Sequence, residues 1–322
     1  MWKGAEKGMI QVKPQLYHVL GAKQFGRSEL DELFDAAREM EDVVRAGGNR
    51  SHQGRIMTTL FFEASTRTRL SFESAMTRLG GNVIGTENAA QFSSAIKGET
   101  LEDTIRIVGG YSDIIVMRHT DIGAAKRAAA VAAVPVINAG DGAGEHPTQA
   151  LLDAYTIQKE IGRIDGVKIA MVGDLAYGRT VHSLSYILAN YQDVMIYYIS
   201  PENVRIPASV KQYMDEKGIR YEETTDLHAV AGSIDVLYQT RIQKERFPSV
   251  EEYEKASGQY IVDEELLTHM RKESIVLHPL PRAGEIAEAV DDDPRAAYFR
   301  QAQNGLYIRM ALVDKSLRGV GL

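Results

Sequence analysis

The chain has 322 residues, of which 44 % are apolar and 25 % charged, and its formal net charge is −7. This length favours two domains, the apolar content is typical of a globular protein with a substantial core, and no apolar run approaches the roughly 20 residues needed to cross a bilayer. The mild negative charge argues against bulk nucleic-acid binding, and the absence of cysteine excludes disulfides, thiolate metal sites and thiol nucleophiles.

Short apolar runs alternate with amphipathic segments along the whole chain. In chain order, the first half is predicted as helix 27–45, strand 56–62, helix 66–79, strand 82–85, helix 101–109, strand 114–117, helix 123–131 and strand 135–139. The second half is predicted as strand 168–172, helix 180–190, strand 194–199, helix 208–217, helix 226–231, strand 234–239, helix 262–270, strand 274–277 and helix 298–317. Short apolar strands between helices indicate parallel sheets covered on both faces. The sequence therefore predicts an α/β protein with two doubly wound parallel-sheet domains.

A helix that opens at His146-Pro147-Thr148 is the expected joint between the two domains, because proline suits the first helical turn. The last predicted helix, 298–317, has no strand after it and is free to pack on either domain. In doubly wound domains, ligands bind at the carboxyl ends of the strands. An active-site cleft is therefore expected where the strand ends of the two domains face each other.

The segment FFEASTRTR at 61–69 carries the densest set of anion-binding groups in the chain. Ser65, Thr66, Arg67 and Thr68 fall where a predicted strand turns into the N-terminus of a helix. Free backbone N–H groups and the helix dipole favour anions there, and the hydroxyls and guanidinium add further donors. The simplest ligand for this cradle is a phosphate. The alternative is an ordinary Ser/Thr helix cap beside solvated arginines.

Further polar side chains follow other predicted strands. They are Arg118 and His146 in the first half, and Arg179, Arg241 and Gln243 in the second. Two arginines suit a ligand with two carboxylates, since each guanidinium can bind one through two hydrogen bonds. Either arginine could instead form a structural ion pair with Glu63 or Glu245. Likewise, a neutral His146 near an anion site can polarise a carbonyl, or it can be a helix cap.

Two turns allow other interpretations. The turn within 169–188 has Gly173 and Gly178 but lacks the full G-x-G-x-x-G pattern, which argues against a nucleotide-binding oxidoreductase. The segment HPLPR at 278–282 is either a simple connection or a rigid loop whose carbonyls face the cleft, and its 280–281 bond is a candidate cis peptide. The eight histidines lack metal-ligand spacing, so neither a metal nor a cofactor is expected.

Seven segments, taken together, resemble the aspartate carbamoyltransferase (aspartate transcarbamylase) family. They are FFEASTRTRLSFE at 61–73, KGETLEDT at 97–104, VMRH at 116–119, NAGDGAGEHPTQALLDAYTI at 138–157, MVGDLAYGRTVHSL at 171–184, YQTRIQKERF at 238–247 and HPLPRAGEIAEAVD at 278–291. They span nearly the whole chain, in order and with compatible spacing. The set is therefore far more specific than any one motif.

The resemblance implies that carbamoyl phosphate and L-aspartate give N-carbamoyl-L-aspartate and phosphate, the committed step of de novo pyrimidine (UMP) biosynthesis. This transfer of a one-carbon group requires no metal. The resemblance also implies a carbamoyl-phosphate-binding domain at 1–147, with the C-terminal helix 300–322 packing back on it, and an aspartate-binding domain at 148–299. The expected assembly is a homotrimer with active sites shared between subunits, either alone or with a regulatory chain or larger assembly, and without nucleic-acid or membrane partners.

By the same resemblance, each substrate has its own set of residues. The carbamoyl-phosphate set is Ser65, Thr66, Arg67, Thr68, Ser93, Arg118, His146, Gln149 and the carbonyls of Leu280 and Pro281, and the aspartate set is Lys97, Arg179, Arg241 and Gln243. Arg67 offsets charge on the leaving oxygen, Thr68, Arg118 and His146 polarise the carbonyl, and Lys97 is the fifth catalytic residue. Ser93 and Lys97 are expected to reach the active site of a neighbouring subunit. A preplaced donor of this kind contributes about 3–4 kcal/mol to the stabilisation of an oxyanion.

Ion pairs are expected to close the two domains around the substrates. The residues implied are Glu63, Arg179, Glu245 and Arg246. Three positions depart from the usual family pattern, namely Ile96, Glu145 (usually Gln) and Gly284 (usually Asp). Loss of the carboxylate at Gly284 removes a partner for Arg246, but none of the departures falls on a residue assigned to chemistry.

A carbamoyltransferase for another amine, such as ornithine, is the main alternative. Ornithine enzymes share the S-T-R-T-R cradle but typically carry an H-C-L-P segment and an S-M-G loop, whereas this chain has H-P-L-P and no cysteine. Two arginines also suit aspartate better than ornithine. An inactive relative acting as a binding scaffold would require the loss of a catalytic group, and none is lost. The expected location is the cytoplasm, or an organelle if a transit peptide has been removed.

Overall fold

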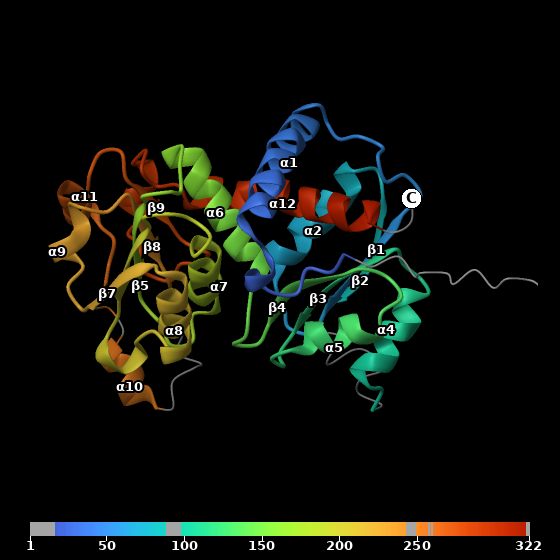
Figure 1. Ribbon diagram of the computed structural model, residues 1–322, viewed down its shortest axis with the longest axis horizontal. Helices are drawn as coiled ribbons and strands as arrows, with labels where there is room; N and C mark the ends of the chain where they lie inside the picture. The colour runs from blue at the N-terminus through green and yellow to red at the C-terminus, as the bar shows by residue number, and fades with distance from the viewer. Residues whose placement is uncertain (1–16, 88–97, 243–248, 257, 259, 320–322) are drawn as a thin grey trace, which may run out of the picture.

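Two parallel sheets form separate lobes in the computed structural model, which describes residues 17–87, 98–242, 249–256, 258 and 260–319 (Figure 1). Within these residues, the first sheet has the order β2-β1-β3-β4, with β1 at Ile56–Phe61, β2 at Asn82–Glu87, β3 at Ile114–His119 and β4 at Val136–Asp141. The second has the order β7-β6-β5-β8-β9, with β5 at Lys168–Val172, β6 at Met195–Ile199, β7 at Arg220–Thr224, β8 at Val236–Gln239 and β9 at Ile275–Leu277. All neighbouring strands pair in parallel. The predicted fold class is therefore confirmed.

Helices connect the strands and cover both faces of each sheet. They are α1 (Arg27–Arg45), α2 (Thr66–Arg78), α4 (Leu101–Gly109), α5 (Ala124–Val131), α6 (Pro147–Ile161), α7 (Arg179–Leu188), α8 (Ala208–Lys217), α9 (His228–Ala231), α10 (Val250–Ala256), α11 (Glu264–His269) and α12 (Tyr298–Arg318), with short 3-10 turns at Ala22–Gln24, Glu202–Val204 and Glu288–Asp292. Sequence periodicity missed β7 and α10. Strand β7 reads RYEET and lies at a sheet edge with no fully buried residue, so it lacks the apolar run on which strand prediction depends.

Alternating residues of the first sheet pack into different cores. Met57 and Phe61 of β1 face the core that includes α1, α2 and α12, whereas Leu60 packs with the residues of α4 and α5. Both faces of the sheet are covered at its inner strands, which explains why β1, β3 and β4 are almost entirely buried, whereas the edge strand β2 is more polar and partly exposed.

One continuous core joins the two lobes through α6 and α12. The same cluster of buried side chains contains Met57 of β1, Leu151 of α6, Met171 of β5 and Leu312 of α12. Helix α12 packs against α1, α2 and α6, and Figure 1 shows it extending from one lobe to the other. The shared core holds the carboxyl ends of the two sheets in a defined arrangement.

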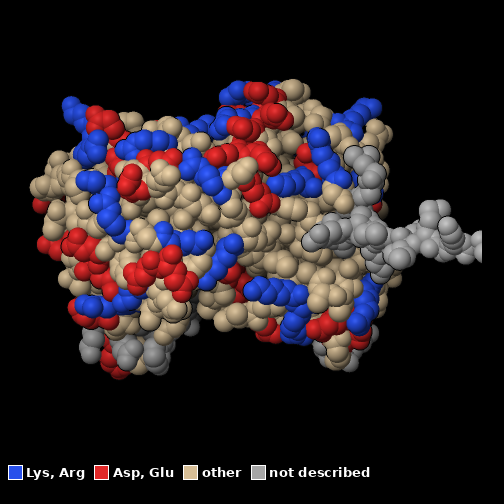
Figure 2. All heavy atoms as spheres, in the orientation of Figure 1, with Lys and Arg blue, Asp and Glu red and all other residues tan. Residues whose placement is uncertain are grey.

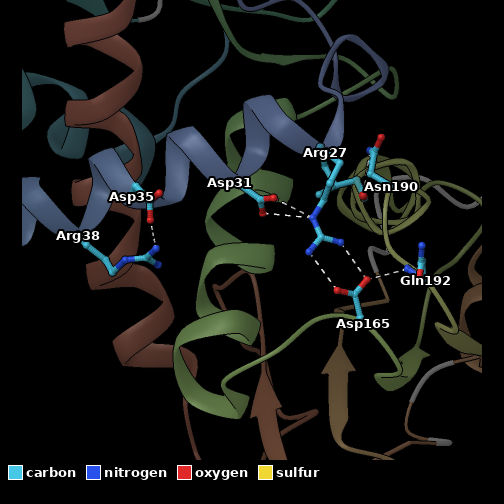
Figure 3. Close-up of polar contacts among 8 residues, drawn as sticks. Arg27, Asp31, Asp35, Arg38, Asp165, Asn190 and Gln192 are labelled. Atoms are coloured by element: carbon cyan, nitrogen blue, oxygen red, sulfur yellow. Dashed lines mark hydrogen bonds and ion pairs between the residues drawn. The ribbon is translucent and has the colours of Figure 1, made fainter.

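A polar contact at the start of α1 also connects the lobes (Figure 3). The Arg27 guanidinium binds both carboxylate oxygens of Asp165 at 2.9 and 3.0 Å, and its Nε donates to Asp31. It also lies 4.2 Å from the ring centroid of Tyr191. Planar stacking and paired hydrogen bonds suit arginine in particular, so Arg27 links α1 to the segment that follows α6.

Surface charge of both signs is interspersed over both lobes on the face shown in Figure 2. The net charge of −7 is therefore not gathered into a single acidic region of this face. No described helix is both long and apolar enough to span a bilayer.

Candidate active site

The carboxyl ends of strands from both sheets border one cleft of about 700 Å³. It is lined by Glu63, Ser65, Thr66, Arg67 and Thr68 after β1, Arg118 of β3, His146 and Gln149 after β4, Arg179 after β5, Arg241 after β8, and Leu280 and Pro281 after β9. Residues from six strand ends thus meet in one place, as expected for doubly wound sheets that face each other.

Five residues that the sequence assigned to the site lie outside the described residues. They are Ser93, Lys97, Gln243, Glu245 and Arg246. Ile96, one of the three departures from the family pattern, also lies there. The roles given to these residues stay predictions.

The N-terminus of α2 presents the hydroxyls and Arg67 to the cleft. Ser65 is the N-cap residue, yet its side chain makes no capping hydrogen bond with the described residues of α2. This observation disfavours the ordinary helix cap as the role of Ser65, because a capping hydroxyl bonds to the first-turn amides. Partial burial of this largely exposed side chain and the nearby charge of Arg118 lower the pKa of Arg67. Arg67 and Arg118 are thus two neighbouring cations beside a helix N-terminus, an arrangement that favours an anion.

Glu63 lies between two arginines that come from different lobes. Its Oε1 accepts a hydrogen bond from Arg118 Nη2 at 2.8 Å, and its Oε2 lies 3.8 Å from Arg179 Nη1. The arginine side chains are only 11 % and 9 % exposed. Gly140, at φ +119°, passes so close that a Cβ there would lie 3.3–3.4 Å from both guanidinium groups. Arg179 and Glu63 thus form an ion pair between residues of the two lobes, and the role of this pair in closing the domains around the substrates stays a prediction.

His146 is the N-cap residue of α6 and is buried at the bottom of the cleft. Its backbone N–H donates to Ser183 Oγ at 3.1 Å, and its side chain makes no capping hydrogen bond with the described part of α6. Burial, followed by the charges of Arg179 and Arg118, lowers its pKa well below the ordinary value. The ring is therefore neutral near pH 7, and a neutral imidazole can donate a hydrogen bond to a carbonyl oxygen.

Gln149 in the first turn of α6 and the loop after β9 form a further wall of the cleft. The Leu280–Pro281 peptide is cis, as the sequence predicted, and Leu280 has φ +52°. Arg282, by contrast, is bound to Asp291 through both terminal nitrogens and is not among the residues that line the cleft. This wall thus offers backbone carbonyls and a side-chain amide rather than charge.

Two family models match the chain in succession. The first, described as aspartate/ornithine carbamoyltransferase, carbamoyl-P binding domain, matches residues 17–159, and the second, described as the Asp/Orn binding domain of the same enzymes, matches residues 165–315. The chain is also 60 % identical over 309 residues to the chloroplastic aspartate carbamoyltransferase of Arabidopsis thaliana, in a match that covers 95 % of this chain and 79 % of that protein. The chain belongs to the aspartate carbamoyltransferase family.

Solved structures of aspartate transcarbamoylases share this fold. The catalytic subunit from M. jannaschii matches with a TM-score of 0.87 and 49 % identity, over 94 % of this chain and 98 % of that one. The Trypanosoma cruzi enzyme in complex with carbamoyl phosphate and aspartate matches with a TM-score of 0.88 and 42 % identity, over 94 % of this chain and 97 % of that one. The family resemblance that the seven sequence segments indicated is therefore confirmed.

The sequence analysis of this family member missed two polar residues of α12 that line the cleft, Gln301 and Arg309. Arg309 is 4 % exposed, and burial lowers its pKa to about 10. A Cβ at Gly305 would lie 2.5 Å from Arg309 Nη1, so glycine makes room for the guanidinium. The available signal was the spacing of Gln301, Gly305 and Arg309 by four residues, which places two polar side chains on one face of a largely buried helix.

The described departures from the family pattern, Glu145 and Gly284, lie away from the main cleft. Glu145 accepts a hydrogen bond from the Ala22 N–H at 2.5 Å, and burial raises its pKa. Gly284 has φ +103° and borders a smaller cavity of about 230 Å³ beside Arg241. Glu145 therefore anchors the N-terminal segment of the described chain.

Proposed function

We propose that the cleft transfers the carbamoyl group of carbamoyl phosphate to the amino group of L-aspartate, which yields N-carbamoyl-L-aspartate and phosphate. One observation carries the proposal: an anion-binding strand-to-helix turn and two arginines at facing strand ends border the same cleft. The aspartate carbamoyltransferases to which the chain is similar support it, including the Trypanosoma cruzi enzyme in complex with carbamoyl phosphate and aspartate. This activity places the protein in pyrimidine biosynthesis.

Carbamoyl phosphate takes the side of the cleft nearer the first sheet. The side chains of Ser65, Thr66 and Thr68 and the first backbone amides of α2 bind the phosphate. Arg67 offsets the charge on the bridging oxygen, which leaves as part of the phosphate. Arg118, His146 and Thr68 donate to the carbonyl oxygen. Gln149 and the carbonyls of Leu280 and Pro281 accept the amide hydrogens, since this wall offers oxygen acceptors.

Aspartate takes the side nearer the second sheet. Arg179 and Arg241 bind its carboxylates, and Gln243 and Lys97 complete the set. The amine attacks the carbonyl carbon and forms a C–N bond, the C–O bond to phosphate breaks, and the departing phosphate takes up the proton that the amine gives up. The tetrahedral intermediate carries an oxyanion, so the donors from Arg118, His146 and Thr68 act where charge develops. Holding both substrates in one cleft supplies much of the remaining rate acceleration.

The proposal extends to the organisation of the enzyme. We assign carbamoyl phosphate binding to 1–147 with the C-terminal segment 300–322, and aspartate binding to 148–299. The enzyme is a homotrimer in which Ser93 and Lys97 enter the neighbouring subunit's site, alone or with a regulatory chain. It works in the cytoplasm or, after removal of a transit peptide, in an organelle, as the chloroplastic enzyme of Arabidopsis thaliana illustrates.

Phosphate release from carbamoyl phosphate tests the reaction. The purified chain is assayed with aspartate and with ornithine in parallel, with no metal added. Release with aspartate alone is the expected result. Release with ornithine alone would overturn the assignment of Arg179 and Arg241, and release with neither would overturn the proposed activity.

Subunit mixing tests the shared site. Lys97→Ala and Arg118→Ala variants are each expected to be inactive. If Lys97 acts in the neighbouring subunit, a mixed trimer has some sites with both residues intact and recovers activity. No recovery in mixed trimers that assemble would contradict the sharing of sites.

A further inference from the structure

A chain of buried hydrogen bonds joins the two parts of the wall that face the carbamoyl amide. Asp153 of α6 is its centre. Its Oδ1 accepts hydrogen bonds from Gln149 Nε2 at 2.8 Å and from Gln301 Nε2 at 2.6 Å, and its Oδ2 accepts one from the Tyr238 hydroxyl at 2.7 Å. Asp153 and Tyr238 are completely buried and Gln301 is 1 % exposed. Three elements, α6, α12 and β8, thus meet on one carboxylate.

The chain continues from Gln301 to the loop that carries the proposed carbonyl acceptors. Gln301 Oε1 accepts the backbone N–H of His278 at 2.8 Å, and His278 Nδ1 accepts the N–H of Leu280 at 2.8 Å. The ring proton of His278 therefore lies on Nε2, which donates to Glu285 at 2.7 Å. The position of residue 280 in this loop depends on Gln301, and Gln301 depends on Asp153.

The charge of Asp153 determines how the amides of Gln149 and Gln301 are oriented. An ionised carboxylate only accepts hydrogen bonds, so it selects the NH₂ end of each neighbouring amide. Gln149 must then turn its oxygen away from Asp153, toward the cleft that it lines, and Gln301 must turn its oxygen toward the loop. Without the carboxylate, either end of the Gln149 amide could face the substrate.

We propose that Asp153 and Gln301 are positioning residues that make this wall of the cleft an acceptor surface, and thereby select an acyl phosphate that carries an amide over one that does not. The inference rests on the proposed function, because it takes carbamoyl phosphate as the substrate. If the NH₂ group of Gln149 faced the NH₂ group of the substrate, two hydrogen-bond donors would face each other. An unpaired polar group in a closed site lowers the affinity for the substrate.

The electrostatic surroundings support an ionised Asp153 under assay conditions. Burial raises its pKa to about 6, although the bonds from Gln301, Tyr238 and Gln149 and the charge of Arg309 oppose this shift. The carboxyl group is therefore ionised near pH 8. The positive charge that opposes the shift is that of Arg309 on α12, the helix that also supplies Gln301.

The experiment compares carbamoyl phosphate with acetyl phosphate, which replaces the amide by a methyl group. At pH 8, the KM for carbamoyl phosphate and the inhibition constant of acetyl phosphate against it are measured for the wild type, Asp153→Ala and Gln301→Met. We expect the preference for carbamoyl phosphate to fall about tenfold in each variant, since one oriented hydrogen bond is lost. Affinity for acetyl phosphate should change little, because it offers no amide hydrogens to this wall.

A matched control is available one turn along the same two helices. Asn304 Nδ2 donates to Thr156 Oγ1 at 3.1 Å, and Asn304 is 3 % exposed. Asn304→Ala removes a buried contact between α12 and α6 that does not lead to the cleft, so it should cost stability without changing the preference. Tyr238→Phe removes the third donor to Asp153 and should likewise keep the preference.

Each outcome of the comparison decides something. An unchanged preference in a folded Asp153→Ala or Gln301→Met variant would overturn the positioning role, as would an equal fall in Asn304→Ala. If Asp153→Ala does not fold by circular dichroism, Gln301→Met carries the test, because it leaves the bond between Gln149 and Asp153 in place. Aspartate-dependent turnover of the wild type is measured in the same preparation. Its absence would contradict the proposed function, whereas turnover with unchanged preferences contradicts only this inference.

Discussion

Replacing Glu63 by alanine tests whether the ion pair across the cleft serves aspartate binding. Glu63 holds Arg118 at 2.8 Å and lies 3.8 Å from Arg179. The contact with Arg179 is an ion pair without a hydrogen bond, and a solvent-screened ion pair contributes about 0.2–1 kcal/mol. The upper end of this range applies here, because the Arg179 side chain is only 9 % exposed although that of Glu63 is 36 % exposed.

A loss of about 1 kcal/mol corresponds to about a fivefold change in an equilibrium constant. We therefore expect Glu63→Ala to raise the KM for aspartate about fivefold, because Arg179 loses its anionic partner from the other lobe. Carbamoyl phosphate binding should not weaken, since the variant removes a negative charge near a dianion.

The assay is aspartate saturation at fixed carbamoyl phosphate, with carbamoyl phosphate affinity measured separately. Glu102→Ala is the matched control, because Glu102 holds Arg127 at 2.8 Å on the same lobe but is not among the residues that line the cleft. Unchanged aspartate saturation in Glu63→Ala, or an equal loss of carbamoyl phosphate affinity, would refute the reasoning.

Three further predictions concern single residues. Arg67→Ala should lower kcat at least about hundredfold, because a charge-stabilising donor is lost. The melting temperature of this variant should stay near that of the wild type, because the Arg67 side chain is exposed. Arg27→Ala should lower the free energy of unfolding in urea by about 1 kcal/mol through loss of Asp165 and the Tyr191 ring, with kcat unchanged. The folded-state pKa of His146 is depressed, so the unfolded chain takes up the proton first as the pH falls. The free energy of unfolding is therefore unaffected by this group above about pH 6.5 and decreases below it, by up to about 1.4 kcal/mol per pH unit. His146→Asn should therefore lose stability less steeply than the wild type between about pH 7 and pH 5.5 in urea titrations; parallel curves would contradict a buried neutral ring.

Local pattern was sufficient wherever one segment carries its own signal. Helices α1, α4 and α8 and strand β5 begin and end where the sequence predicted, because their apolar spacing and terminal residues are contained within the element. The placement of Ser65–Thr68 at a strand-to-helix turn belongs to this class, since the strand and the helix start are adjacent in the chain, whereas the phosphate-binding role of these residues stays a prediction. Strand β7 was missed because a polar edge strand has no such signal.

The sequence by itself thus determined the α/β class, most of the elements in their order and which strand ends carry arginines and hydroxyls. Only the tertiary structure decided which of these side chains share a cleft and what holds them. Asp153 and Gln301 are 148 positions apart and Glu63 and Arg118 are 55 apart, yet each pair is in hydrogen-bond contact. Periodicity reports that a face of a helix is buried, but not which element covers it. The hydrogen-bond partners of a buried carboxylate such as Asp153 are therefore decided only by the packing of α6, α12 and β8.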